Sequence, residues 1–327
     1  MKLHVLLMKR TVQFSLLALL VATATFLLST LIPGDFYSAR ELDPMVSRET
    51  IGELRRQHGL DLPVHVQYLR WLGGALRLDL GHSLHFQAPV AVILGPALLN
   101  TLWLGIPALA AGILLGAALG SAHALCARKA AGAALDLLAT VALSLPSLVL
   151  GLAALLVAAR TGWFPMGGTE SPVMTDPTAA ARALDRLHHL ALPLFCLTFP
   201  IAAYVERIQF AATQGYLQSP AIHSARARGL SRARIFTHYL LRPSLNPVLS
   251  VSGPLFGAVL SGSLILEVLF AWPGLGQVTY DALFSHDLFL LLGCVMASSL
   301  LLIAGNILAD LLLYLLDPRT RAALRSV

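Results

Sequence analysis

Long apolar runs, separated by polar stretches, are the main pattern along this chain. Six runs cover residues 12–32, 98–122, 135–158, 190–210, 248–270 and 288–315. A helix needs about 20 mainly apolar residues to cross a bilayer, and each run reaches that length. The pattern therefore predicts an all-α integral membrane protein with six transmembrane helices in a single domain, residues 1–327.

Two of these runs have features of their own. The first has a basic flank like a secretory signal peptide, but it ends in "LIPGD" and has no small-residue cleavage site, so we interpret it as a retained helix. The fourth contains Pro193 and Pro200, and a proline inside a helix removes a backbone hydrogen bond. We expect a kinked helix there.

Composition and charge support the membrane assignment and predict an orientation. The chain is 57% hydrophobic and 12% charged, and its mean hydropathy is +0.74. Six spans place both termini on one side, and that side carries 14 Lys and Arg residues against 9 on the other. Because Lys and Arg concentrate in short cytoplasmic loops, we predict cytoplasmic termini, a cytoplasmic loop at 211–247 and an extracytoplasmic segment at 33–96.

The cytoplasmic loop contains the stretch "HSARARGLSRARIFTHYLLRP", residues 223–243, with five arginines. Arginines here could serve only to fix the orientation and to contact lipid headgroups. The small residues Ala225, Ala227 and Gly229 between them also leave room for the backbone of a partner. The charge pattern alone leaves both interpretations open.

The positions of proline and glycine in this loop favour a helix, a turn and a second helix. Pro220 suits the first turn of a helix and Gly229 suits a C-terminal cap. A second helical run covers residues 231–241 and is expected to end before Pro243. A loop that marked topology alone would not need such defined helix ends.

Seven stretches follow one another in a recognisable order: "STLIPGD", "PALLNTLWLG", "SLPSLVLGL", "WFPMGG", "ARARGLS", "EVLFAWPGLGQVTYDALFSHD" and "NILADLLLYLLDPRTR". Together they resemble the permease subunits of binding-protein-dependent ABC importers, in the dipeptide, oligopeptide and nickel branch. The resemblance extends over nearly the whole chain. It implies the type I ABC importer permease fold, in the inner membrane of a bacterium.

The resemblance also implies partners and a mode of action. Such a permease pairs with a second homologous permease, forms the pathway for peptides or a related small solute, and works by alternating access. Two cytoplasmic subunits bind ATP and Mg, and an extracytoplasmic solute-binding protein delivers the substrate. No cofactor in this chain and no nucleic-acid partner are implied, and lipid surrounds the spans.

In this family the cytoplasmic loop carries a coupling helix that docks into a groove on an ATPase subunit. The matching positions here are His223, Ser224, Ala225, Arg226, Ala227, Arg228, Gly229 and Leu230. Two positions depart from the general motif, because His223 stands where it has an acidic residue and Arg242 where it has a proline.

Two further sets of residues are candidates for contacts between subunits. Small residues on one face of the fifth run, which favour close helix packing or line a pathway or permease interface, are Ser250, Gly253, Gly257 and Ser261. The resemblance implies docking of the solute-binding protein at Trp272, Pro273, Gly274 and Gly276. The outer segment contributes an amphipathic helix expected at the outer membrane surface, with Val64, Tyr68, Trp71 and Leu72 on one side.

Motifs for catalysis within this chain are absent from the sequence. It contains no GxxxxGK[ST] loop for nucleotide phosphates, no HExxH and no GxSxG. The adjacent His188 and His189 lack further ligands at metal spacing. We therefore predict a transport subunit that is not an enzyme and binds no metal.

The alternative is an ion-coupled secondary transporter, because ionisable residues inside spans can relay protons. The candidates are Glu206, Glu267 and Asp310, with Asn306 one turn before Asp310. Glu206 and Glu267 are expected near span ends, where their side chains can reach the interface. The halves of the chain also show no clear internal repeat of the kind many such transporters have.

Overall fold

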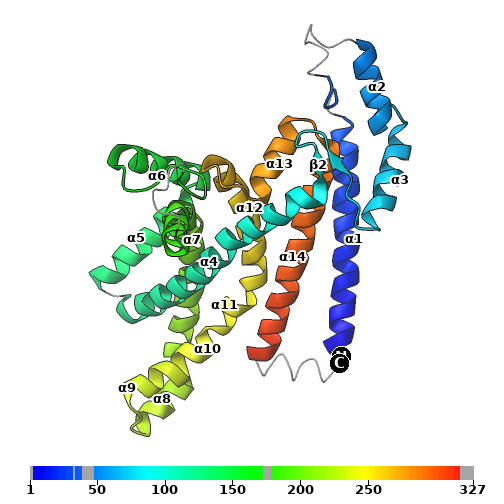
Figure 1. Cartoon of the computed structure of the whole chain (residues 1–327). Coiled ribbons are helices and arrows are strands. Elements are labelled where there is room, and N and C mark those ends of the chain that lie inside the picture. Colours follow the sequence, from blue (N-terminus) through cyan, green and yellow to red (C-terminus); the bar gives the residue numbers. More distant parts are fainter. Residues whose placement is uncertain (1–2, 32–33, 39–47, 128, 172–177, 317–327) are drawn as a thin grey trace. The chain divides into compact units, whose positions relative to one another are not determined.

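The computed structural model describes residues 3–31, 34–38, 48–127, 129–171 and 178–316, which are mostly helical (Figure 1). The first elements are α1 (Leu3–Ser29), α2 (Arg48–His58), α3 (Val64–Ala75), β1 (His82–Ser83), β2 (Ala88–Pro89), α4 (Val90–Cys126), α5 (Ala130–Ser144) and α6 (Ser147–Thr161). The others are α7 (Ala179–Leu217), α8 (Pro220–Ala227), α9 (Arg232–Arg234), the π-helix η2 (Ile235–Leu241), α10 (Arg242–Ser244), α11 (Asn246–Ser250), α12 (Ser252–Leu269), α13 (Leu275–Phe284) and α14 (Leu288–Leu316). The strands β1 and β2 pair antiparallel.

The chain divides into two compact units, each with its own apolar core. Unit 1 consists of Met1–Leu6, Leu102–Trp272 and Ala304–Val327, and unit 2 of Leu7–Thr101 and Pro273–Ile303. Leu104 and Leu266 belong to a core of unit 1, and Val90 and Leu290 to a core of unit 2. The boundaries between the units fall within α4 and α14, so each of these helices contributes residues to both units. The single domain over residues 1–327 stays a prediction.

Several helices have the length and composition to cross a membrane. Within the described residues, four pass on their own: Val90–Cys126, Ala179–Leu217, Ser252–Leu269 and Leu288–Ala309. A fifth span is added if the bent pair α5 and α6 counts as one. The apolar helix Ser15–Ser29 is shorter than these spans. Large apolar side chains such as Leu114, 71% exposed, face outward as on a lipid-contacting surface. The chain is therefore a multi-pass membrane protein, whereas six spans remain a prediction.

The third apolar run is not one continuous helix. α5 and α6 meet at 103°. Between them Leu145 has extended backbone, and Pro146 precedes the first turn of α6. A residue before proline avoids the α region, which ends α5 at this point. Residues 135–158 therefore form a bent pair of helices instead of one continuous helix, and their crossing of the membrane as one span stays a prediction.

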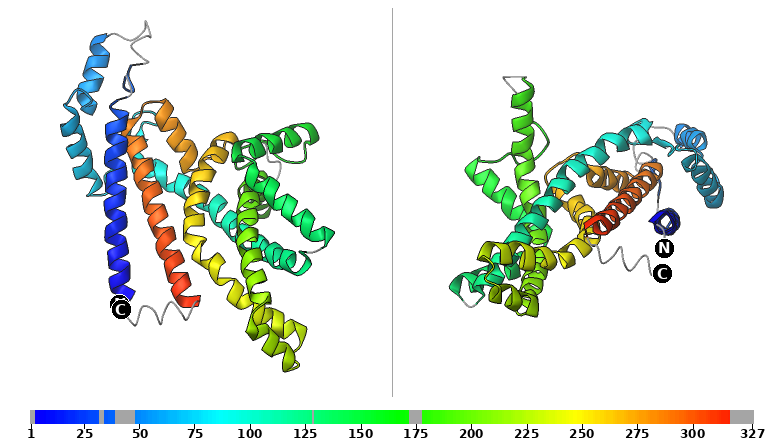
Figure 2. Two further views of the ribbon diagram at one scale, coloured as in Figure 1. Left: turned by 180° about the vertical axis from the view of Figure 1, so that it is seen from behind. Right: turned by 90° about the horizontal axis from the view of Figure 1, so that it is seen from below.

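The helix α7 continues without a break through Pro193 and Pro200, and the kink predicted there stays a prediction. It crosses α4 closely, and both helices are visible in Figures 1 and 2. A methyl group added at Gly116 would lie 2.5 Å from the Ala202 carbonyl oxygen, and one added at Gly120 would lie 2.5 Å from the Glu206 carbonyl oxygen. The two backbones touch, which only glycine permits.

In unit 2 the predicted amphipathic helix is present as α3. Its Trp71 is 5% exposed and packs with Ala22 and Phe26 of α1. The hydroxyl groups of Tyr68 and Thr23 lie 2.6 Å apart. The apolar side of α3 therefore packs on α1, and its placement at the outer membrane surface stays a prediction.

Candidate coupling loop and buried polar network

The helix α8 has both ends defined by its sequence. Pro220 occupies its first turn, and Gly229 beyond its C-terminus has a φ of +71°. The Gly229 N–H donates to the Arg226 carbonyl at 3.0 Å, and the Leu230 N–H donates to the Ala225 carbonyl at 3.3 Å. This pair of bonds is the Schellman motif. The prediction that Gly229 caps the helix is confirmed.

One side of α8 packs inside the chain, against η2. Ile222 and Ala225 are 0% exposed, whereas Ala227 is exposed. The prediction that Ala225 leaves room for the backbone of a partner is wrong, because it lies on the inner side of α8, and Ala227, two positions on, points about 200° away from it. The exposed members of the predicted coupling set are His223, Ser224, Arg226, Ala227, Arg228 and Gly229.

The second helical run begins at Ser231, whose Oγ accepts a hydrogen bond from the Arg234 N–H at 3.4 Å. It continues from α9 into the π-helix η2 and then into α10, where Pro243 lies in the first turn. The predicted end before Pro243 is wrong.

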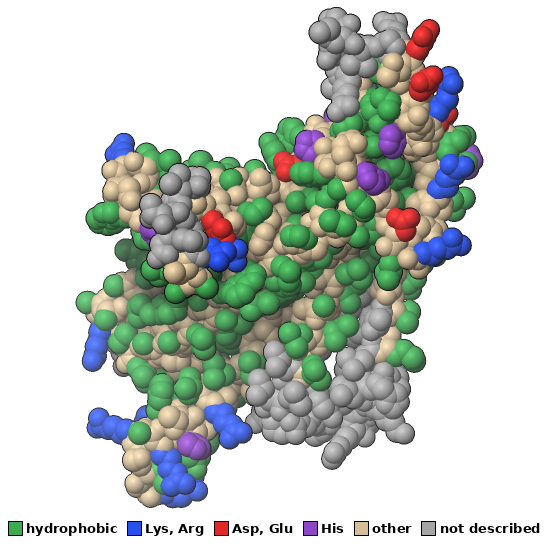
Figure 3. Space-filling view, in the orientation of Figure 1, with side chains coloured by type: hydrophobic (Ala, Val, Ile, Leu, Met, Phe, Trp, Pro, Cys, Tyr) green, Lys and Arg blue, Asp and Glu red, His purple; other side chains and the backbone are tan. Residues whose placement is uncertain are grey.

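Basic side chains gather at the end formed by α8 and α9 (Figure 3). Arg226, Arg232 and Arg234 are exposed. Arg228 instead lies over the ring of Tyr239, with 5.9 Å between the guanidinium carbon and the ring centroid, and joins α8 to η2. The loop therefore presents cationic groups to its surroundings and uses one arginine to hold its own shape.

A buried network lies at the base of the loop. The Nε2 of Gln209 on α7 lies 2.9 Å from Ser244 Oγ on α10 and 3.1 Å from both Ser121 Oγ on α4 and Thr213 Oγ1, so its two hydrogens are shared among three hydroxyl groups. Gln209 and Ser244 are 0% exposed. Within the described residues, Oε1 of Gln209 has no hydrogen-bond partner. One amide group thus connects three helices.

A second buried pair joins α4 to α7. His123 Nδ1 and Glu206 Oε1 lie 2.6 Å apart, and Phe210 stacks on the imidazole with 4.0 Å between centroids. The expectation that Glu206 and Glu267 lie where they can reach the interface is wrong, because they are 2% and 0% exposed. Glu206 is held by a partner instead of by water.

Comparison with known families identifies the chain. Residues 93–322 match the family described as "Binding-protein-dependent transport system inner membrane component". Residues 3–100 match its companion, "Binding-prot-dependent transport system membrane comp, N-term". The chain belongs to this family. The resemblance predicted from the sequence is confirmed.

Curated relatives of this permease cover nearly its full length. The oligopeptide transport system permease protein AppB of Bacillus subtilis (strain 168) is 29% identical over 95% of this chain and 97% of its own. A putative peptide transport system permease protein of Brucella abortus (strain 2308) is 32% identical over 97% and 98%. The glutathione transport system permease protein GsiC of Salmonella paratyphi A is 30% identical over 93% and 94%.

Membership in this family bears on two of the predictions. The family consists of transport subunits of the inner membrane, which are not themselves enzymes. The relatives are likewise permeases of transport systems. They give no support to the alternative of an ion-coupled secondary transporter. The side chain of its candidate Asp310 lies outside the described residues.

The small residues of the fifth span do not form one open surface in the permease. Gly253 is buried, and a methyl group added there would lie 3.0 Å from Asn306 Oδ1 on α14. Ser250 and Ser261 are exposed and Gly257 is half-buried. Gly253 thus serves packing within the chain, and a place for the set at the pathway or permease interface stays a prediction.

Most of the predicted docking residues for a solute-binding protein are inside the permease. Trp272 is 4% exposed and belongs to a core of unit 1, and Gly274 and Gly276 are buried in unit 2. Of the four, Pro273 is exposed, and its carbonyl accepts a hydrogen bond from Asn100 Nδ2 at 2.9 Å. The expectation of a four-residue docking surface is corrected to internal packing with one accessible residue.

The histidine pair at the start of α7 bonds to backbone. His188 Nε2 lies 2.8 Å from the Trp163 carbonyl oxygen, and His189 Nδ1 lies 2.9 Å from the Asp185 carbonyl oxygen. Within the part of the chain that the structure describes, no group of three or more His, Cys, Asp or Glu could hold a metal ion.

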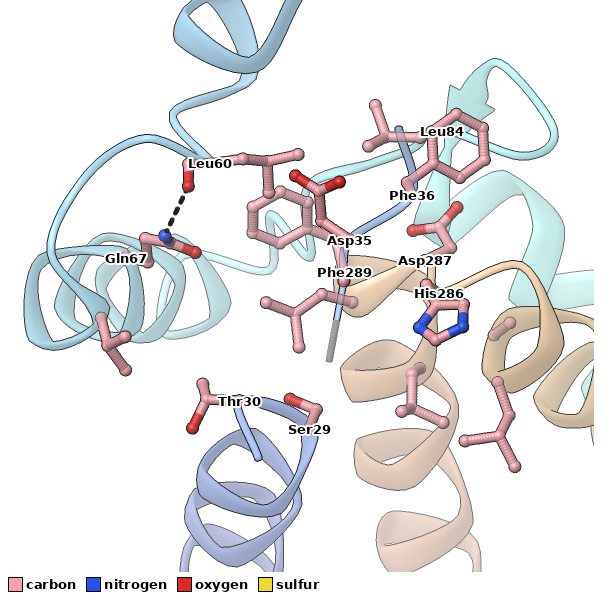
Figure 4. Close-up of a pocket in the computed structure, with 16 residues that line it drawn as sticks. Ser29, Thr30, Asp35, Phe36, Leu60, Gln67, Leu84, His286, Asp287 and Phe289 are labelled. Atoms are coloured by element: carbon pink, nitrogen blue, oxygen red, sulfur yellow. Dashed lines mark hydrogen bonds between the residues drawn. The ribbon is translucent and has the colours of Figure 1, made fainter. Parts of the chain in front are cut away.

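A pocket of about 260 Å³ lies in unit 2 (Figure 4). Its wall combines Asp35 and Phe36 from the segment after α1, Gln67 of α3, and His286 and Phe289 around the start of α14. The mixed lining offers both apolar surface and hydrogen-bonding groups. The carboxylate of Asp35 in this lining, however, already accepts hydrogen bonds from an arginine of the chain.

Asp35 is bound by Arg55 of α2. Arg55 Nε donates to Oδ2 at 2.7 Å and Nη2 donates to Oδ1 at 2.8 Å. Burial alone would raise the pKa of Asp35, but hydrogen bonds from Arg55 and Ser38 and the Arg55 charge together lower it below its ordinary value. This bidentate pair fastens α2 to the segment after α1.

Proposed function

We propose that this permease is the transmembrane subunit of an ATP-driven importer for peptides or a related small solute. It pairs with a second homologous permease, and the two form the translocation pathway and work by alternating access. The observation that carries the proposal is α8, a short helix with defined ends and one exposed side in the basic loop between α7 and α12. The peptide and glutathione permeases among its relatives support the substrate class.

The coupling step uses α8 as a lever. An ATPase can shift the equilibrium between two permease conformations only through contacts that differ between them. A helix with fixed ends, joined to α7 on one side and to η2 on the other, carries a displacement without bending. The exposed residues from His223 to Gly229 form the contact, with Arg226 facing acidic or carbonyl groups of the ATPase.

The remaining parts of the assembly follow from this role. ATP and Mg bind to two cytoplasmic ATPase subunits, and this chain needs no cofactor of its own. An extracytoplasmic solute-binding protein delivers the substrate. Both termini are cytoplasmic, although residues 1–2 and 317–327 lie outside the described residues.

The test begins with gentle affinity purification of the tagged permease from its native membrane. We expect a second permease and nucleotide-hydrolysing subunits to purify with it, and the reconstituted complex to import labelled di-, tri- or pentapeptides with ATP. A chain that purifies alone and transports under an ion gradient would overturn the proposal.

The variant Gly229→Val tests the role of α8. A methyl group at Gly229 meets nothing within 4 Å, but its φ of +71° strains any residue with a Cβ. That strain costs about 1–2 kcal/mol, so we expect an inserted chain whose ATP-driven transport falls on the order of tenfold. The control Gly215→Ala, at an open position of α7 without positive φ, should transport normally. Equal transport by both variants would remove α8 from the coupling step.

A further inference from the structure

The buried amide of Gln209 lies where the cytoplasmic loop leaves and rejoins the membrane helices. Gln209 is eight residues before the end of α7 at Leu217, and the chain continues from there into α8. It returns through η2 to Ser244 in α10. The 2.9 Å bond between Gln209 Nε2 and Ser244 Oγ therefore closes the loop at its base.

The same amide reaches a third helix. Ser121 Oγ of α4 lies 3.1 Å from Gln209 Nε2, and Thr213 Oγ1 lies at the same distance. These hydroxyl groups are buried, with Ser121 at 4% and Thr213 at 1% exposure. Because water is excluded, breaking one of these bonds leaves an uncompensated polar group, which disfavours loosening.

At this level α4 and α7 also touch through their backbones. A methyl group at Gly120 would lie 2.5 Å from the Glu206 carbonyl oxygen and 2.8 Å from Gln209 Cβ. Because Gly120 has no side chain, the backbone of α4 lies directly against α7 at this point. A displacement of α7 here therefore moves α4 as well. The His123–Glu206 pair reinforces the same contact.

We propose that Gln209 and Ser244 are positioning residues that transmit displacement of α8 to α4 and α7. This inference rests on the proposed function, and adds the path inside the chain by which ATP-driven movement reaches the spans. Without the Gln209–Ser244 bond, α10 can shift against α7 when α8 is pushed. ATP is then hydrolysed without a matching reorientation of α4 and α7.

The test is the ratio of peptide imported to ATP hydrolysed, measured on the complete reconstituted complex with a labelled peptide that the wild type imports. Ser244→Ala should lower this ratio on the order of fivefold, the factor for one net hydrogen bond, while ATP hydrolysis persists. Ser252→Ala is the matched control, because the Ser252 hydroxyl donates to the Leu249 carbonyl at 2.7 Å, a local bond like that of Ser244 to the Leu241 carbonyl. Its ratio should stay at the wild-type value.

A second pair of variants addresses the other end of the bond. Gln209→Met keeps the side-chain volume and should lower the ratio like Ser244→Ala, and the double variant should be no worse than either alone. Gln214→Met is its control, because Gln214 lies on the same helix and bonds to the Ala124 carbonyl on α4 at 3.2 Å, not to α10.

Three outcomes would overturn the inference: an unchanged ratio in Ser244→Ala and Gln209→Met, an equal loss in the controls, or additive losses in the double variant. If both test variants fail to assemble while both controls assemble, the network serves folding alone, and the inference is again wrong. Failure of the proposed function is seen separately, because the wild-type complex itself would then lack ATP-driven import.

Discussion

At the scale of single residues, the bond between Asp35 and Arg55 defines how the outer segment begins. Asp35 directly follows the "LIPG" sequence, and its Oδ1 also accepts hydrogen bonds from the Tyr37 N–H at 3.1 Å and the Ser38 hydroxyl at 2.8 Å. These donors favour the charged carboxylate, which lowers its pKa in the folded protein. A lowered folded pKa means stabilisation that is present above the unfolded pKa and is lost as pH falls through the folded value.

This bond predicts an acid-sensitive attachment of α2. Asp35→Asn should make the α2 amides exchange their hydrogens about fivefold faster at neutral pH, for a partly buried pair worth about 1 kcal/mol. In the wild type the same acceleration should develop only as pH falls below the ordinary aspartate pKa of about 3.9, and it is complete only below the lowered folded pKa of Asp35. Hydrogen exchange corrected for intrinsic rates measures both effects. The control Glu53→Gln removes an exposed carboxylate of the same helix, and if it matched Asp35→Asn the bond would not be the cause.

Pairs of this kind could not be predicted from the sequence. Asp35 and Arg55 are 20 residues apart, and His123 and Glu206 are 83 apart. Their partners are decided by how helices pack, and the sequence showed Glu206 only as an acidic residue near the end of a span. By contrast, the cap at Gly229 was predictable because its cause is local, a glycine directly after a helical run.

At the scale of elements, the glycines of α4 determine how closely α7 can approach. Gly112, Gly116 and Gly120 recur at every fourth position and therefore lie on one face of the helix. We expect Gly120→Ala to destabilise the purified permease by about 1–3 kcal/mol, because its methyl group has no space beside α7. Thermal unfolding in detergent measures this. Gly95→Ala on the same helix meets nothing within 4 Å and should leave the midpoint unchanged. Equal midpoints for both variants would contradict the crossing.

The helices that were predicted well are those whose apolar runs have clear polar ends. The runs at 98–122, 190–210 and 288–315 lie within α4, α7 and α14. The bend within the run at 135–158 was not predicted, because hydropathy does not register the change of direction that Pro146 imposes on the backbone. The glycine spacing of α4 was readable in the sequence, and it is the signal that would have predicted the α4–α7 contact.

At the scale of the whole molecule, the orientation in the membrane is the prediction with the widest consequences. A cysteine at position 78, where Leu78 is 88% exposed in the outer segment, should react with an impermeant maleimide added to cells with a permeable outer envelope. Ala233→Cys, in the exposed part of the loop outside the proposed ATPase contact, should react only after the inner membrane is opened. The unaltered chain, with Cys196 and Cys294 buried and Cys126 partly buried, is the control. The reverse pattern would invert the topology.

The family and its type of work were predictable from the order of short motifs, because those motifs extend over the whole chain. The docking surface for a solute-binding protein was not predictable from the sequence. A tryptophan among glycines is the same pattern whether these residues face a partner or a core. Trp272 turned out to lie in a core of unit 1. Subunit contacts depend on which side of an element faces outward, and hydropathy in a membrane protein does not distinguish lipid from protein neighbours.

The π-helix η2 makes the length of the cytoplasmic loop as constrained as its composition. An α-helix turns by about 100° per residue, and a π-helical turn accommodates more residues than an α-helical one. Deleting one residue between Ile235 and Leu241 would let this segment relax into α-helix and keep the flanking helices in register, whereas inserting one would rotate α8 against α10 by roughly that angle. Homologous loops should therefore tolerate many substitutions on the outer side of η2, and a one-residue deletion within it, but few insertions.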